Sequence, residues 1–292
     1  MLFKGVGTAL ATPFSGGAID YEALEKLIAL QIEAKVPAII ISGTTGEAPT
    51  ISSEEKAELF KRANEFIDGK AMFIAGTGTN DTSEVIKLSE TAMKAGAQGL
   101  LINNPYYNKS SDEGVYASYE AVDKEVNIPI IVYNVPSRTG KNISAELGLE
   151  LSKLKNVEGF KEASGDISQI VQFMAQKPDG IQVYSGNDDQ VLAIMAHGGS
   201  GVISTISNIV PEMMVKITDA WFSGDTEAAK QAQFECHEIF KAIFIEVNPI
   251  PLKTAMGLMG LCSGEMRLPL VPLTGAKLEK LEAVLAKYGL LG

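Results

Sequence analysis

The sequence has 292 residues, and 46% of them are hydrophobic, which suffices for one large core or for a barrel of about 250 residues with an appendage. Lysine and arginine number 25 and aspartate and glutamate 36, so the formal net charge is −11, which disfavours binding to nucleic acid or to anionic membranes. The N-terminus lacks the pattern of a secretory leader, and no apolar run reaches about 18 residues, so we expect a cytoplasmic protein without a membrane partner.

Eight short apolar runs, rich in β-branched residues, recur along the chain. They lack alternating polar residues, which is typical of parallel strands buried on both faces. These predicted strands are Gly7–Ala11, Ala38–Ser42, Met72–Gly76, Gly99–Ile102, Ile128–Tyr133, Val157–Lys161, Ile181–Ser185 and Gly201–Ser204.

Helical patterns with start signals lie between these runs. Asp20 precedes a helical pattern over residues 21–34. Ser52 and Glu55 are spaced as a capping box before residues 56–66. Start signals of this kind predict a helix after each strand.

Two further starts follow the same logic. Asp81 or Thr82 begins a helix that Gly96 ends. Asn187 opens a helix through residues 191–199, with Asp188 and Asp189 as first-turn charges rather than metal ligands.

The repeated order of strand and helix predicts a (β/α)8 TIM barrel over residues 1–224. A doubly wound sheet has the same repeating pattern and is the alternative. Residues 225–292 contain only helical patterns, such as those over 226–244 and 277–289. We expect them to form a C-terminal helical region of the same domain.

Lys161 is the most informative candidate residue, because it ends the sixth predicted strand, and chemistry in a TIM barrel lies at the carboxyl ends of the strands. Removal from water disfavours an ammonium, and a neutral amine is a nucleophile for ketones. The alternatives are a lysine that extends to solvent and one in a structural ion pair.

Polar residues at other strand ends could assist such an amine. Tyr133, at the end of the fifth strand, could transfer a proton, or be an ordinary barrel tyrosine. Thr44 and Thr45 lie in a glycine-flanked turn and could bind a carboxylate or relay protons, or serve only the turn. Arg138 lies in a loop over the strand ends, where it could bind a carboxylate. The alternative is an arginine that is only solvated.

Other motifs are less specific. The sequence GTGTN at 76–80 is not a dinucleotide fingerprint, and HGGSG at 197–201 reads as a helix end. His197 and His237 lack metal-ligand spacing, and no metal site is predicted. Cys236 and Cys262 are predicted to be free thiols rather than a disulfide.

Taken together, the motifs resemble the dihydrodipicolinate synthase / N-acetylneuraminate lyase family. The resemblance runs from Gly5 to about Arg267. The motifs stand in the family's order: GTTGE at 43–47, PYYNK at 105–109, YNVPSRTG at 133–140, KEASGD at 161–166, SGNDDQ at 185–190 and NPIPLKTAM at 248–256.

The resemblance implies a role for each matching residue. Lys161 matches the lysine that forms a Schiff base with pyruvate, and Tyr133 the phenol that assists it. Thr45 and Tyr107 match the rest of a hydroxyl relay that Thr44 orders. Arg138 matches the arginine that binds the carboxylate of L-aspartate 4-semialdehyde. Two pocket positions that act through backbone groups are matched by Gly186 and Ile203.

The implied reaction condenses pyruvate with L-aspartate 4-semialdehyde to 4-hydroxy-tetrahydrodipicolinate, on the route to diaminopimelate and lysine, without metal or organic cofactor. Sugar-acid lyases of the family share the lysine and tyrosine but usually carry GSTGE and lack the arginine, so Thr44 and Arg138 favour the synthase. A sugar-acid aldolase and a non-catalytic keto-acid-binding barrel remain alternatives.

The resemblance also implies assembly and regulation. In relatives Tyr107 crosses a tight dimer interface, so a homotetramer of tight dimers is expected. Asn80, Glu84 and Tyr106 match the ligand positions of an allosteric lysine site at the dimer interface.

Two histidines common at that site are replaced here by Ser53 and Lys56. Because Lys56 puts a cation beside a cationic effector, weak or absent lysine inhibition is expected. Asn104 stands where threonine is commoner.

Overall fold

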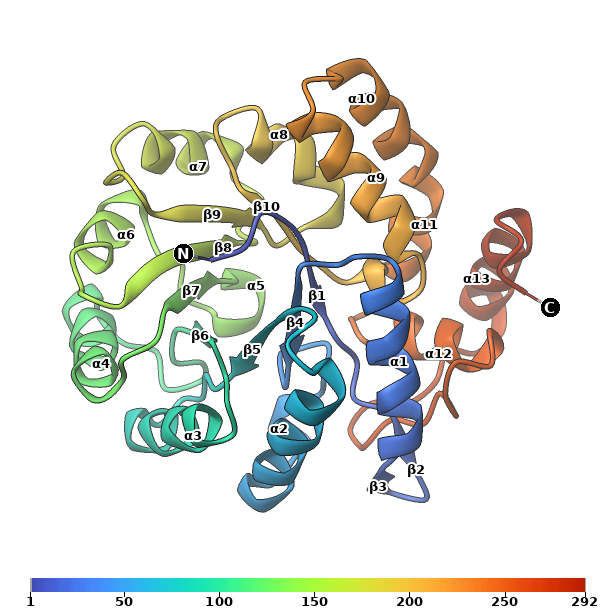
Figure 1. Ribbon diagram of the computed structural model, residues 1–292, viewed down its shortest axis with the longest axis horizontal. Helices are drawn as coiled ribbons and strands as arrows, with labels where there is room; N and C mark the ends of the chain where they lie inside the picture. Colours follow the sequence, from blue (N-terminus) through green and yellow to red (C-terminus); the bar gives the residue numbers. More distant parts are fainter. Residues whose placement is uncertain (1, 292) are drawn as a thin grey trace.

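The computed structural model describes residues 2–291, which are built around one closed barrel of parallel strands (Figure 1). The order around the barrel is β1-β10-β9-β8-β7-β6-β5-β4, so β1 closes the ring against β10 and β4. The barrel strands are β1 (Gly5–Ala9), β4 (Ala38–Ile41), β5 (Met72–Gly76), β6 (Gly99–Asn103), β7 (Ile130–Asn134), β8 (Val157–Glu162), β9 (Gln182–Ser185) and β10 (Gly201–Ser204). The predicted TIM barrel is confirmed, and the doubly wound alternative is wrong because the sheet closes on itself.

Helices surround the strands as an outer layer (Figure 1). They are α1 (Tyr21–Glu33), α2 (Ser53–Ile67), α3 (Thr82–Lys94), α4 (Asp112–Glu125), α6 (Ala145–Leu151), α7 (Ile167–Met174), α8 (Val191–Met195) and α9 (Pro211–Phe222). An additional single turn, α5 (Pro136–Thr139), follows β7 directly. The predicted loop around Arg138 is therefore helical.

The helix starts follow the capping rules. The side chain of Asp20 accepts a hydrogen bond from the Ala23 N–H, and Ser52 and Glu55 form both bonds of the capping box. The start after β9 differs from the prediction, because a 3-10 turn (η2, Asp188–Gln190) precedes α8. Asp188 is no exposed first-turn charge, since its buried carboxylate accepts the N–H groups of residues 205 and 206.

The first strand begins two residues earlier than predicted. Asn208 accepts a hydrogen bond from the Ala11 N–H and donates one to the Ala9 carbonyl. Its side chain therefore takes the place of a neighbouring strand after Ala9.

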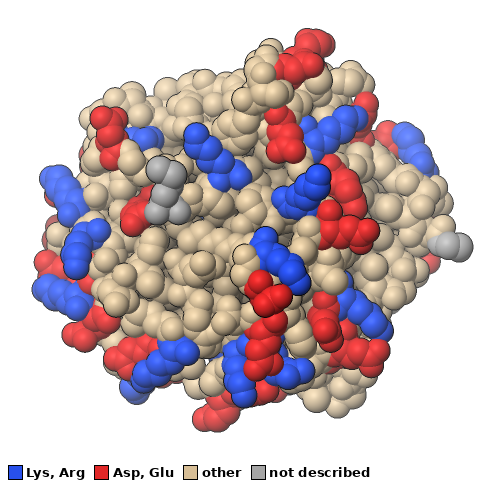
Figure 2. Space-filling view, viewed as in Figure 1, with Lys and Arg blue, Asp and Glu red and all other residues tan. Residues whose placement is uncertain are grey.

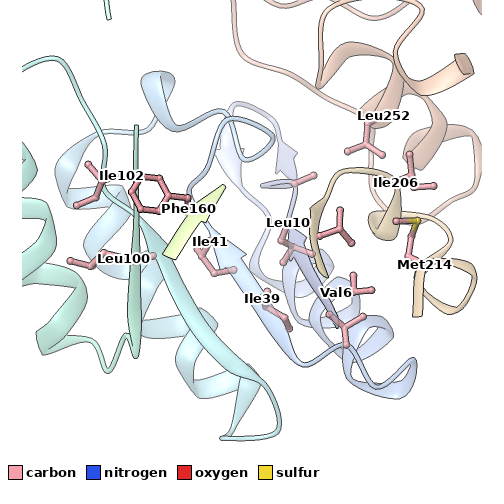
Figure 3. Close-up of a cluster of buried hydrophobic side chains, with 14 of the residues drawn as sticks. Val6, Leu10, Ile39, Ile41, Leu100, Ile102, Phe160, Ile206, Met214 and Leu252 are labelled. Atoms are coloured by element: carbon pink, nitrogen blue, oxygen red, sulfur yellow. The ribbon is translucent and has the colours of Figure 1, made fainter. Parts of the chain in front are cut away.

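The core has two parts, separated by the alternation of side chains along each strand. In β4, Ala38 and Ile40 face the barrel interior, whereas Ile39 and Ile41 face the helices. Figure 3 shows the outer part, in which Leu252 lies near Ile206. The interior part is smaller, so polar side chains at the strand ends have room above it.

Residues 225–291 lie at one side of the barrel (Figure 1). They contain α10 (Thr226–Glu235), α11 (His237–Ile243), α12 (Ile250–Leu258) and α13 (Gly275–Lys287). The predicted helix over 226–244 is divided at Cys236, and α12 and a two-stranded hairpin of β2 (Phe14–Ser15) and β3 (Ala18–Ile19) were not predicted.

The surface carries charges of both signs. On the face shown in Figure 2, basic and acidic side chains are interspersed, and they do not form one basic patch. Within residues 2–291, no helix has the length and apolar character needed to cross a membrane. Cys236 and Cys262 are free thiols, and burial raises the pKa of Cys236 to about 12.

Candidate active site

The register between β7 and β8 places Tyr133 directly opposite Lys161 at the carboxyl end of the barrel. Both side chains face the interior and are almost inaccessible, with 7% of Tyr133 and 5% of Lys161 exposed. The Lys161 amine lies 4.3 Å from the centre of the Tyr133 ring. No carboxylate of residues 2–291 lies within ion-pair distance of this amine, which argues against both structural alternatives for the lysine.

A cavity of about 350 Å³ opens above this pair. Lys161 and Arg138 are the basic residues in its wall, and Glu246 is the acidic one. Gly186 also lines it, and a Cβ atom there would approach the Lys161 Cε to 3.1 Å and the Ala163 Cβ to 2.7 Å. Glycine at 186 therefore leaves the space that the lysine side chain needs.

Thr44 and Thr45 line the same cavity from the turn after β4. The Thr45 hydroxyl accepts a hydrogen bond of 2.9 Å from the side-chain amide of Asn248, which lies 203 residues later in the chain. This bond orients the Thr45 hydroxyl, whose own proton is left for a partner other than Asn248. No role was predicted for Asn248, although it begins the last of the family motifs.

Arg138 is held by the same residue. Its Nη2 donates a hydrogen bond of 2.7 Å to the Asn248 carbonyl, which fixes the guanidinium at the cavity wall. Only one of its five N–H donors is used in this bond, so a fork of donors is left for a planar anion. Asn248 thus connects the two polar groups farthest from the strand pair.

A buried ion pair fixes the turn that carries the threonines. Lys253 of α12 is fully buried, and its amine lies 2.5 Å from a carboxylate oxygen of Glu47 and donates to the Thr12 carbonyl at 2.8 Å. Burial lowers the pKa of Lys253, and the Glu47 carboxylate opposes this shift. Glu47 has a φ of 56°, in the left-handed region, so the pair also stabilises a sharp turn after Gly46.

Two predicted residues lie outside this cavity. Tyr107 is 93% exposed, with a φ of 70°, and does not line the Lys161 cavity of its own chain. Ile203 is buried in the barrel interior together with Tyr133. The structure therefore brings together Lys161, Tyr133, Thr44, Thr45, Arg138 and Gly186, but not Tyr107.

The residues predicted for allostery share a second cavity of about 420 Å³. Asn80, Glu84 and Tyr106 line it, together with Ser53 and Lys56. It also shares wall residues with the first cavity, namely Gly43, Thr44, Leu101, Tyr133, Val135 and Arg138. The two cavities are therefore neighbours separated by the tyrosine and the arginine.

Asn104 has a structural function. Its side chain is buried and donates a hydrogen bond of 3.0 Å to the Lys141 carbonyl. It thereby ties the end of β6 to the segment after α5, next to the loop that carries Tyr107.

The comparisons with known proteins agree with this geometry. The family model described as "Dihydrodipicolinate synthetase family" matches residues 2–288. The chain is therefore an enzyme of the dihydrodipicolinate synthetase family. A 4-hydroxy-tetrahydrodipicolinate synthase of a Thermoanaerobacter species is 48% identical over 291 residues, which cover 99% of this chain and 98% of the relative.

Solved structures give the same result. The crystal structure of a dihydrodipicolinate synthase from Thermotoga maritima has a TM-score of 0.97 and 43% identity, and all of both chains is covered. A dihydrodipicolinate synthase variant described as monomeric also has a TM-score of 0.97 and 43% identity, covering 99% of this chain and 98% of its own. The fold of the family is thus compatible with a monomeric variant.

Proposed function

We propose that the protein is a pyruvate-dependent class I lyase that condenses pyruvate with L-aspartate 4-semialdehyde to 4-hydroxy-tetrahydrodipicolinate, in the route to diaminopimelate and lysine. The observation that carries the proposal is the buried Lys161 amine beside the Tyr133 ring, in a cavity that also contains Thr45 and Arg138. The two free cysteines are in keeping with a reducing cytoplasm.

In the proposed mechanism, the neutral amine of Lys161 adds to the ketone of pyruvate and expels water, which gives an imine. Loss of a methyl proton converts the imine into an enamine, and the protein-linked imine is the electron sink. The Tyr133 phenol transfers protons at this carbon and at the departing oxygen. No further cofactor takes part in these steps.

The enamine then attacks the aldehyde carbon of the second substrate. Arg138 binds the carboxylate of this substrate through its free N–H donors, which holds the aldehyde near the enamine. The amine of the condensed product attacks the imine carbon, closes the ring and releases Lys161. One water is lost overall, so the atoms balance.

Borohydride trapping tests the Lys161 assignment. The enzyme is treated with pyruvate and sodium borohydride and then analysed by intact mass and peptide mapping. A pyruvyl adduct on Lys161 is expected, and none on a Lys161→Ala variant. An unmodified wild-type chain would refute both this reaction and any other pyruvate aldolase.

Substrate comparison separates the synthase from a sugar-acid aldolase. Aspartate semialdehyde is expected to react with the pyruvate enamine on unreduced Lys161, whereas N-acetylneuraminate and 2-keto-3-deoxygluconate are not cleaved. Cleavage of either sugar acid at a rate comparable to condensation would favour the aldolase.

We also propose that the protein is a homo-oligomer, built as a tetramer from tight dimers, in which Tyr107 completes the site of the neighbouring subunit. The 93% exposure of this aromatic side chain supports the proposal, since its own chain provides no cover. Mixing inactive Tyr107→Phe and Lys161→Ala variants should restore part of the activity, because one site of the mixed dimer has both residues. A fully active monomer would refute the proposal.

A further inference from the structure

A second polar pair lies directly behind the strand pair of the active site. In the register of β7 with β8, Asn134 is opposite Glu162, one residue beyond Tyr133 and Lys161. Because side chains alternate along a strand, Asn134 and Glu162 face the helices when Tyr133 and Lys161 face the cavity. Both Asn134 and Glu162 are buried, with 0% and 4% of their surface exposed.

The contacts of this outer pair are close to complete. The Asn134 Nδ2 lies 3.2 Å from both carboxyl oxygens of Glu162, and the Ser164 hydroxyl donates to Glu162 at 3.0 Å. The Asn134 Oδ1 accepts the N–H of Ile143 at 3.0 Å. The pair therefore joins both strands to the segment before α6.

The backbone of the same residues continues the network toward the cavity. The Glu162 carbonyl accepts the N–H of Gly186 at 2.6 Å, and the Asn134 carbonyl accepts the N–H of Ala163 at 2.9 Å. Gly186 and Ala163 both line the cavity beside Lys161. Strands β7, β8 and β9 are thus locked together at the level of the lysine.

We propose that Glu162 and Asn134 are positioning residues, which fix the ends of β7 and β8 so that the Lys161 amine stays over the Tyr133 ring. The proposal rests on the proposed role of Lys161 as nucleophile. Glu162 acts here through the hydrogen bonds that it accepts rather than as a counterion of the lysine.

Burial disfavours the charged form of this carboxyl group. Burial raises the pKa of Glu162 to about 7, which exceeds the lowering by its bonds to Asn134 and Ser164, and the nearby Asp166 raises it further. A carboxyl group whose pKa is raised by folding stabilises the fold at pH values below its ordinary pKa. This contribution is lost as the pH rises through about 7. The thermal midpoint of the wild type should therefore decrease as the pH rises from 5 to 8.

Two substitutions at Glu162 separate positioning from charge. Glu162→Gln keeps a neutral polar group of the same size, and we expect a trapping rate with pyruvate within about threefold of wild type and a flatter dependence of the thermal midpoint on pH. Glu162→Ala removes the contacts, and its trapping rate and kcat should fall about 10- to 100-fold, the range in which small misplacements of reacting groups act. The KM for the aldehyde should change little.

The control is Gln169→Ala, which removes bonds from Asn142 and Ile143 in the same cluster without touching Glu162. It should lower stability but leave the trapping rate unchanged. A Glu162→Ala protein that is folded by circular dichroism and traps pyruvate at the wild-type rate would overturn the inference. A Gln variant as slow as the Ala variant would show that the charge of Glu162 is required, and would overturn its role through hydrogen bonds. If wild type itself forms no adduct, the proposed function fails instead.

Discussion

The two sides of the cavity are held in different ways. Tyr133 and Lys161 are on neighbouring barrel strands, where backbone register sets their separation. Thr45 and Arg138 are on turns beyond the strand ends, and both are held by Asn248. In the proposed mechanism, the barrel therefore forms the side on which the imine is made, whereas a distant segment shapes the side that receives the second substrate.

This difference means that the two sides can be disturbed separately. Changes in residues 246–267 should alter the threonine turn and the arginine while leaving the lysine and tyrosine in place. Pyruvate trapping reports on the first side, and the KM for the aldehyde reports on the second. The following predictions use these two measurements, together with stability.

Breaking the buried ion pair should have the largest effect. Lys253→Met leaves the carboxylate of Glu47 buried without its partner, and we expect the free energy of unfolding to fall by about 3–5 kcal/mol. Urea denaturation measures this loss. Lys26→Met, which breaks the exposed pair with Glu22, serves as the control and should change stability by less than about 1 kcal/mol. Equal losses in the two variants would contradict the prediction.

Removing the arginine should affect the second substrate alone. In Arg138→Leu the KM for aspartate semialdehyde should rise about 10- to 150-fold, which corresponds to a charge-assisted bond of about 1.5–3 kcal/mol. The rate of pyruvate trapping on Lys161 should not change. Arg138→Lys keeps the charge but not the fork of donors, so its KM for aspartate semialdehyde should lie between those of the wild type and Arg138→Leu. An equal rise in the KM for pyruvate would show that Arg138 serves both substrates.

Substitution of Asn248 should have a smaller effect on catalysis, because the backbone carbonyl of residue 248 remains available to Arg138 in any variant. Asn248→Ala removes the donor to Thr45, and kcat should fall about 5- to 15-fold, as expected for one hydrogen bond of about 1–1.5 kcal/mol. Thr45→Val tests the same bond from the other side. If the bond matters, the double variant should be less impaired than the sum of the two single effects.

The sequence predicted the strand side better than the turn side. Eight apolar runs and the position of Lys161 at a strand end are local signals, and the barrel brings such ends together. The contacts of Asn248 and Lys253 join residues more than 200 positions apart, and no periodicity or capping signal encodes them. The contacts of Asp188 could not be predicted for the same reason, since its partners, residues 205 and 206, follow the next strand.

The smallest expected effect concerns the second cavity, where we expect that added lysine does not inhibit the enzyme. Burial lowers the pKa of Lys56, and the Glu84 carboxylate opposes this shift, so the two groups lie within electrostatic reach in the cavity wall. The Ser53 hydroxyl donates to Glu84 at 2.8 Å. Glu84 is thus already provided with a donor and a nearby amine from its own chain.

A lysine molecule in this cavity would therefore bring a second ammonium toward Lys56, and like charges at such distances repel. We expect condensation activity to be unchanged in millimolar L-lysine. A Lys56→His variant, paired with Ser53→His, should acquire measurable inhibition, since it removes the permanent cation; Lys87→Met is the control, because it removes an exposed amine from the same carboxylate. Strong inhibition of the wild type would show that Lys56 moves aside, and the cavity next to Tyr133 would then be a working effector site.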